Sequence, residues 1–329
     1  MAVAMIHYSN SIADAMSFKL RAVRNLSISL GNGRRSICPS TRQVQLAAVM
    51  MLCVYDVPDN AQVFDREEHN WHIHVNGAKE IIRRQRFIDT PDPSSDFLLT
   101  WWLYHDVLAT FNHPSWRRNE SPGSVSPSAL QDFSGDKSLI VGSLGCSVEV
   151  LEIIDEINNM RLSSPQGCMN TSTSQRCDLA TKLYHLRQLL APIESSDSLR
   201  SHRILAIAEL YRLATLLYLQ RVHPIMEDDD ITRPTYVQHA LEILARLDVA
   251  TSPWPVFVIA CEVDEQDRVN ILYTLDRMDS VRSIGNIKVL RDVIEGIWKQ
   301  EDLRNIGKAG QRVDWLQFVE CDVPVPWFI

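Results

Sequence analysis

The spacing of the apolar residues is the feature that most constrains the fold, because they recur every three or four positions along most of the chain. This period places apolar side chains on one face of an α-helix, and we find no convincing alternation of apolar and polar residues longer than about four positions. The sequence therefore predicts an all-α protein of about ten to twelve helices in one large irregular helical domain, with no sheet.

The expected helices are separated by two polar interruptions. We predict loops at 113–137 and 163–174, where Ser, Pro, Asn and Gly break the helical spacing. The segment after Trp254 is the nearest candidate for a strand, although Pro255 also fits the first turn of a helix. Apolar stripes predict helices over 12–31, 40–55, 71–86, 94–111, 179–190, 204–218, 237–247, 271–278 and 290–297.

Composition and charge exclude several classes of protein. Of the 329 residues, 45% are hydrophobic and 22% charged, which is typical of a folded, soluble chain and not of a disordered one. The N-terminus does not resemble a secretory signal, and the longest apolar run, 46–55, is too short to span a membrane. The net charge of −8 disfavours general binding to nucleic acid. Seven scattered cysteines without a Cys-x-x-Cys pair favour a reducing compartment and no structural zinc.

Histidines and carboxylates give one candidate metal site. His69, His72 and His74 lie close in sequence, but a helix directs His74 about 160° away from His72, so the three do not converge. A second arrangement, His74 with His105 and Asp106, followed by Asp132 or Asp155, fits the ligand order of HD-type metal-dependent phosphohydrolases. In such a site a divalent cation would activate water against a phosphate ester. Because a lone His-Asp pair is a weak signal, we keep this enzyme as the alternative.

Other polar motifs have ordinary structural explanations. The sequence contains no nucleophile elbow, no Gly-rich phosphate loop and no His-Glu-x-x-His motif. Ser147 is expected to cap the helix that follows it, and the acidic run 227–230 to form a solvated turn. The residues alone thus predict no catalytic residue, no metal site and no cofactor.

Several segments in order resemble the fungal-specific transcription factor domain, the helical regulatory region of binuclear zinc-cluster transcription factors. Trp71-His-Ile-His-Val-Asn-Gly-Ala-Lys resembles one marker helix, and the aromatic run 97–108 with its His-Asp-Val resembles the next. Segments 145–157, 208–219 and 254–315 are similar to later parts of the domain. The matching positions are His74, Gly77, Ala78, His105, Asp106, Cys146, Trp254, Pro255, Arg268 and Trp298.

The resemblance implies a division at residue 39, with 1–39 as an N-terminal helical extension and 40–329 as the regulatory domain. It implies that His105 is a buried hydrogen-bonding residue on an aromatic face, and that Gly77 and Ala78 permit close helix packing. The sequence departs from the family pattern because it carries no block of six cysteines with interleaved Lys and Arg. Either the chain is a truncated gene product, or it is a regulator that acts through a partner.

The function implied by the resemblance is regulation of transcription in the nucleus, with or without shuttling to the cytoplasm, and control of a metabolic or secondary-metabolite gene cluster. The expected partners are proteins, namely a co-regulator, a second copy of the chain or a zinc-cluster protein. No association with a membrane is expected. A small hydrophobic effector between helices is a further expectation. The aromatic residues Trp71, Trp101, Trp102 and Tyr104 are candidates for such a pocket or, more often, for the core. An interaction scaffold with no nuclear role is a third alternative.

Overall fold

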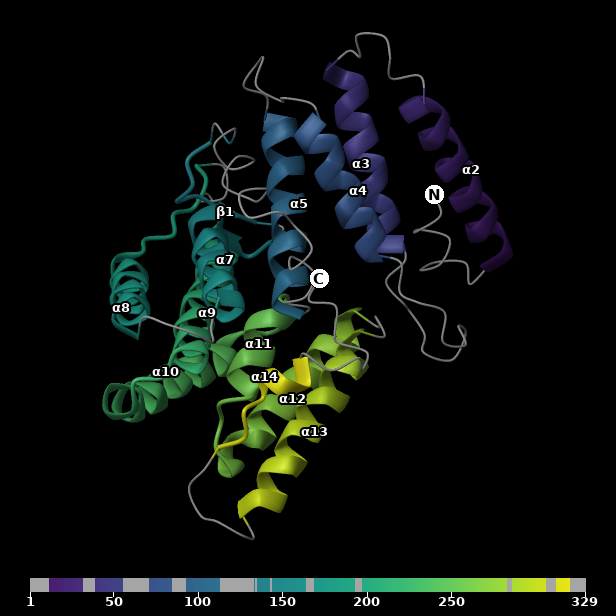
Figure 1. The fold of residues 1–329 in the computed structure, drawn as a ribbon. Coiled ribbons are helices and arrows are strands. Elements are labelled where there is room, and N and C mark those ends of the chain that lie inside the picture. The colour runs from purple at the N-terminus through teal and green to yellow at the C-terminus, as the bar shows by residue number, and fades with distance from the viewer. Residues whose placement is uncertain are drawn as a thin grey trace. The chain divides into compact units, whose positions relative to one another are not determined.

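The computed structural model describes residues 12–31, 39–55, 71–84, 93–112, 133, 135–142, 144–163, 169–192, 197–282, 286–305 and 312–319. These residues form twelve α-helices, one 3₁₀ turn and a two-stranded sheet, which confirms the predicted all-α class (Figure 1). The described helices belong to two compact units. Helices α2 to α4 and α5 up to Asp106 belong to the first unit, and α5 from Val107 onward belongs to the second with all later elements.

The first unit is built on four helices whose apolar stripes the sequence predicts. They are α2 (Ile12–Gly31), α3 (Pro39–Tyr55), α4 (Trp71–Arg84) and α5 (Pro93–Asn112). Helix α3 packs against α4 on one side and α2 on another. The core includes Leu46, Met50 and Val75, all fully buried. One polar contact connects α3 to α5: Gln43 Nε2 donates a hydrogen bond to Ser95 Oγ at 2.8 Å.

The second unit is organised around a 25-residue helix, α9, with α7, α8, α10 and α11 packed against it (Figure 1). Asp197 caps α9 by accepting hydrogen bonds from the backbone N–H groups of Leu199 and Arg200. Twelve residues of α9 between Ile207 and Gln220 are buried, which explains why this helix is apolar on nearly every side. The elements are α7 (Val148–Ser163), α8 (Met169–His185), α9 (Ser198–Val222), α10 (Met226–Arg246), α11 (Pro253–Ala260), η3 (Glu265–Asp267), α12 (Arg268–Arg282), α13 (Asn286–Asn305) and α14 (Leu316–Val319).

Helix α11 resolves the ambiguity at Trp254. All eight residues of α11 are buried, and prolines occupy its first turn, where their missing N–H groups have no partner inside a helix. A short apolar run can form either a buried strand or a buried helix, and here the prolines favour the helix. The strand alternative at this segment is therefore wrong.

A small sheet is the one departure from the predicted absence of strands. Ile140–Val141 (β1) pairs antiparallel with Cys146–Ser147 (β2). Gly145 reverses the chain between them with φ of +82°, a left-handed conformation that glycine adopts without steric cost. Helical periodicity contains no signal for two-residue strands, so the sequence could not reveal this turn.

The predicted loops meet different outcomes. The segment 113–137 falls almost entirely outside the described residues. The predicted loop at 163–174 is wrong in its second half, because α8 already begins at Met169. The run Asn-Thr-Ser-Thr-Ser favours loops in isolation, but Leu179 and Leu183 anchor α8 in the core, and polar residues extend it at little cost.

Two further expectations concern boundaries and membranes. Helix α2, inside the predicted extension, packs against α3, inside the predicted regulatory domain, so the division at residue 39 stays a prediction. None of the described helices is long and apolar enough to cross a membrane.

Candidate functional site

His105 and Asp106 occupy the interior of α5, with only 2% and 0% of their surfaces exposed. The Nδ1 atom of His105 lies 2.6 Å from the carbonyl oxygen of Trp101, which can only accept, so Nδ1 carries the proton and donates. Burial lowers the pKa of His105 to about 4, outweighing the opposite effect of the Trp101 carbonyl. His105 is therefore neutral at physiological pH and hydrogen-bonded within its own helix, as the resemblance implies.

The carboxylate of Asp106 lies 3.8 Å from the ammonium of Lys79 on α4, and both side chains are buried. Among the residues that the structure describes, no three His, Cys, Asp or Glu side chains are grouped to hold a metal ion. His74 is half-buried on α4, Asp155 belongs to the second unit, and His69, Asp132 and the side chain of His72 lie outside the described set. The arrangement gives the phosphohydrolase alternative no support.

Two of the aromatic residues proposed as pocket or core, Trp102 and Tyr104, belong to the core. Trp102 and Tyr104 are 2% and 4% exposed, and Trp102 Nε1 donates to the carbonyl of Val75 at 3.3 Å. Trp101 is half-buried against the His105 ring, with 5.8 Å between ring centroids. The side chain of Trp71 lies outside the described set. The Trp102 hydrogen bond joins α5 to α4 within the first unit.

A larger aromatic cluster fills the second unit between α9, α11 and the segment 312–319. Its members are Phe111, Tyr211, Tyr218, Trp254, Phe257 and Trp315, all fully buried. The rings of Trp254 and Tyr211 stack with centroids 5.8 Å apart at 16°, and Phe111 meets Trp254 edge-on at 5.7 Å. Such pairs add about 0.5–1.5 kcal/mol each beyond the burial of their surface. The cluster is a packed interior.

A buried carboxylate lies at the edge of this cluster. Glu262 Oε1 accepts hydrogen bonds from Arg221 Nη2 and from Trp315 Nε1, both at 2.7 Å. Oε2 lies 3.6 Å from Arg233 and 3.8 Å from Arg312. The guanidinium groups compensate the buried charge, so Glu262 connects α9 and α10 to the segment 312–319.

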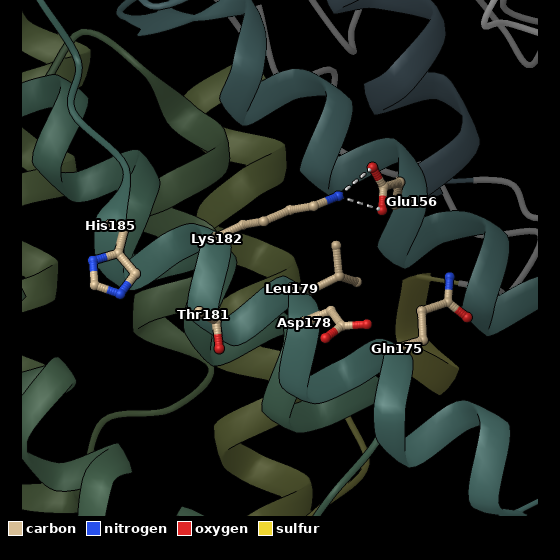
Figure 2. A pocket seen from close by; sticks show the side chains of 7 residues that line it. All are labelled: Glu156, Gln175, Asp178, Leu179, Thr181, Lys182 and His185. Atoms are coloured by element: carbon tan, nitrogen blue, oxygen red, sulfur yellow. Dashed lines mark hydrogen bonds and ion pairs between the residues drawn. The ribbon is translucent and has the colours of Figure 1, made fainter.

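A surface groove of about 480 Å³ runs between α7 and α8 (Figure 2). Lys182 reaches across it to Glu156, with Nζ 3.2 and 3.3 Å from the two carboxylate oxygens. The hydroxyl of Thr181 donates to the Cys177 carbonyl on its own helix. The lining residues are Glu156, Gln175, Asp178, Leu179, Thr181, Lys182 and His185. With no nucleophile paired to a base, this lining does not suit catalysis.

Comparison with known families identifies the architecture. Residues 1–328 match the fungal-specific transcription factor domain. The chain belongs to this family. Transcription factor iacI of Pestalotiopsis fici is 25% identical over 311 residues, which make up 92% of this chain and 76% of that protein. No solved structure matches. The family and the relative support a role as a transcriptional regulator.

The structure brings two motif residues of the fungal transcription factor domain together. The guanidinium of Arg268 lies over the ring of Trp298 at 5.4 Å, and it contacts the carboxylates of Glu301 and Asp302 at 3.3 and 2.8 Å. Trp298 Nε1 donates to the Ala260 carbonyl at 2.8 Å. These motif positions therefore join α11, α12 and α13.

Other motif residues of the family domain are also structural. Cys146 is fully buried in β2, and burial raises the pKa of its thiol far above the usual range, so it is no nucleophile. Ala78 is fully buried, and Pro255 lies in the first turn of α11. A Cβ atom at Gly77 would lie 3.9 Å from Val49, an ordinary contact, so close helix packing does not require glycine there.

Sequence reasoning missed or misread two polar positions. Asp229 is 1% exposed in α10, forms an ion pair with Arg176 of α8, and accepts from the backbone N–H of Ile225 at 2.6 Å. The predicted solvated turn at 227–230 is therefore wrong. The hydroxyl of Ser147 makes no hydrogen bond, so Ser147 precedes α7 without capping it through its side chain. Instead, the Ser147 N–H donates to Gln188 Oε1 at 2.9 Å.

Proposed function

We propose that this chain regulates transcription in the nucleus through protein contacts made by its helical surface. The observation that carries the proposal is the family match over residues 1–328. The packed interior supports it, since the histidine, cysteines and aromatic rings that sequence motifs single out serve the core of their units. Shuttling between nucleus and cytoplasm belongs to the same proposal.

The reading of DNA is assigned in this proposal to a zinc-cluster module outside these 329 residues, which contain no Cys-x-x-Cys pair. The net charge of −8 also disfavours binding to phosphates by the chain as a whole. The partners are a co-regulator, a second copy of the chain or a zinc-cluster protein. The target genes are those of a metabolic or secondary-metabolite cluster.

The first experiment fuses the chain to an unrelated DNA-binding module and measures a reporter gene that carries its sites. The folded fusion is expected to raise or lower reporter output. A Trp254→Ala fusion serves as the control, because loss of a fully buried indole from the aromatic cluster disrupts the fold. Reporter output that is identical for the folded fusion and the DNA-binding module alone would contradict the proposal.

A second experiment separates DNA reading from regulation. The chain alone is expected to give no sequence-specific gel shift on promoters whose transcripts change when its gene is deleted. Those promoters are expected to belong to neighbouring genes, and a fluorescent fusion to enter the nucleus. A sequence-specific shift by the chain alone would overturn the assignment of DNA reading to another module.

The small hydrophobic effector stays a prediction. The groove between α7 and α8 is lined mainly by polar residues, but apolar atoms make up the larger part of its exposed surface, so it does not argue against such a molecule. An effector that binds the folded chain would raise its melting temperature further as the effector concentration rises above the dissociation constant.

A further inference from the structure

The charges of the chain are distributed unevenly. Between residues 15 and 55 there are six basic residues and no acidic one, so this segment is strongly positive in a chain of net charge −8. All 41 acidic residues lie in the other 288 positions. The basic residues are Lys19, Arg21, Arg24, Arg34, Arg35 and Arg42. Lys19, Arg21 and Arg24 lie on α2 and Arg42 lies on α3, so the two helices together carry a net positive charge even with Asp14 in the first turn of α2.

Helix α2 also carries an apolar stripe that faces solvent. At 3.6 residues per turn, the stripe and one serine within it cover about 80° of the helix circumference. Leu20 is 63% exposed and Val23 is 40% exposed. The stripe consists of Met16, Leu20, Val23 and Leu30, with Ser27 between the last two. Apolar side chains at this spacing are the usual contact face of a helix that pairs with another helix.

The opposite side of α2 is already occupied within its unit. Ser29, which is not on the stripe, accepts a hydrogen bond from Gln45 Nε2 of α3 at 2.8 Å. In the first unit α3 lies between α4 and α2, which leaves the apolar stripe without a described helix against it (Figure 1). Helix α3 contributes two exposed apolar side chains of its own, Val44 and Met51.

The combination of charge and apolar stripe selects the class of partner. A second copy of α2 would bring two basic surfaces together, and like charges across an interface disfavour that pairing. A DNA backbone would use the arginines but not the apolar stripe. A membrane-surface helix usually carries large aromatic residues on its apolar face, whereas Phe18 lies away from the stripe beneath the guanidinium of Arg21. An acidic amphipathic helix satisfies both features, because it buries the stripe and places its carboxylates beside Lys19 and Arg24 at the edges of the stripe.

We propose that the exposed face of α2, with Lys19 and Arg24 on either side of its apolar stripe, is the docking surface for an acidic amphipathic helix of a partner protein. The inference rests on the proposed regulatory function only for its biological role, since the binding is measurable without transcription. It also gives the expected co-regulator a chemical description.

The direct test uses the full chain and a synthetic fluorescent peptide of about 20 residues with Leu at the a and d positions of its heptads and Glu beside them. Fluorescence anisotropy is expected to show saturable binding that weakens as salt is raised, because the arginines are exposed to screening. One control peptide replaces each Glu by Lys, and a second scrambles the order of the same residues. Both control peptides are expected to bind at least about tenfold more weakly.

Variants of exposed residues locate the binding face without disturbing the core. Leu20→Ser with Val23→Ser is expected to weaken peptide binding by about tenfold or more, and Arg24→Glu to weaken it several-fold with a smaller salt dependence. The matched controls are Leu199→Ser and Arg246→Glu, which change an exposed leucine and an exposed arginine of the second unit. These controls are expected to leave binding unchanged. Circular dichroism checks that every variant is folded.

Other occupants are separate outcomes that overturn the proposal. Dimerisation that Leu20→Ser abolishes would assign the face to a second copy of the chain. Leu20-dependent binding to phosphatidylserine vesicles or to a random DNA duplex, tighter than binding to the Glu peptide, would assign it to a membrane or nucleic acid. Equal binding of the Glu and Lys peptides, or peptide binding insensitive to Leu20 and Arg24, would also overturn it. A reporter that fails while the peptide binds would refute the regulatory function alone.

Discussion

The indole Nε1 of Trp315 donates a hydrogen bond to Oε1 of Glu262 at 2.7 Å, across 53 residues of sequence, and both side chains are essentially fully buried. The same carboxylate oxygen accepts from Arg221 of α9. Trp315 also meets the rings of Phe257 and Tyr218 in the aromatic cluster. This one side chain therefore completes both the apolar and the charged part of the interior of the second unit.

Trp315→Phe keeps most of the apolar contact but removes the hydrogen bond to the buried carboxylate. We expect the free energy of unfolding to fall by about 1–3 kcal/mol, as measured by urea denaturation. Leu303→Ala, at an exposed position of α13, is the control and is expected to change it by less than about 0.5 kcal/mol. Equal stability of Trp315→Phe and the native chain would show that the hydrogen bond contributes nothing.

Two glycines are expected to respond to alanine in opposite directions. A Cβ at Gly145 would lie 2.7 Å from Ile207 Cγ2 and 2.9 Å from Ser252 Oγ, at a positive φ, so Gly145→Ala should destabilise by about 2 kcal/mol or more. A Cβ at Gly296 in α13 meets no atom within 4 Å, so Gly296→Ala should stabilise by about 0.5–1 kcal/mol. Thermal unfolding of both variants checks the pair, and a lower melting temperature for Gly296→Ala would contradict the second expectation.

The buried imidazole of His105 makes stability depend on pH. The unfolded state takes up a proton near the ordinary pKa of 6.5, whereas the folded state stays neutral until about pH 4. The contribution of His105 to the free energy of unfolding is therefore fully present above pH 6.5. It is lost as pH falls toward 4, and the loss is on the order of 3 kcal/mol.

His105→Gln is expected to flatten this part of the pH profile of unfolding free energy. His202→Gln, which changes an exposed histidine of α9, should keep the native slope. An unchanged slope in His105→Gln would refute the assignment of the pH dependence to His105.

Two ion pairs between a basic and an acidic side chain are expected to contribute differently to stability because one is buried and the other is exposed. Asp229→Ala removes one partner of the buried pair with Arg176 and leaves that guanidinium without its carboxylate, which should cost about 3–5 kcal/mol. Lys182→Ala breaks the exposed pair with Glu156 in the groove and should cost less than about 1 kcal/mol. Urea denaturation of both variants tests the contrast, and similar losses would contradict it.

The sequence predicts the helical class and most helices because amphipathic periodicity records burial directly. The helix predicted from Ile12 and stopped by Gly31 coincides with α2, and the stripe through Leu179 and Leu183 lies in α8. The errors arise where long-range contacts decide. Asp229 appears as one of several acids in a polar run, and only Arg176, 53 residues earlier, makes it a buried residue.

The candidate surface on α2 was accessible to sequence analysis in part. The absence of acidic residues over 15–55 is visible in the sequence. Periodicity marks Leu20 and Val23 as apolar without saying whether a neighbouring helix covers them. Their exposure follows only from the position of α3, which packs against the other side of α2.

Helix α11 also has a consequence for biosynthesis. Phe257 of this helix emerges from the ribosome more than fifty residues before Trp315, the ring that packs edge-on against it. During that interval the part of α11 that the later segment covers is exposed, and exposed hydrophobic surface is a target for chaperones and proteases. A premature stop before residue 315 thus leaves Phe257 without this ring, so quality control would remove such shortened products.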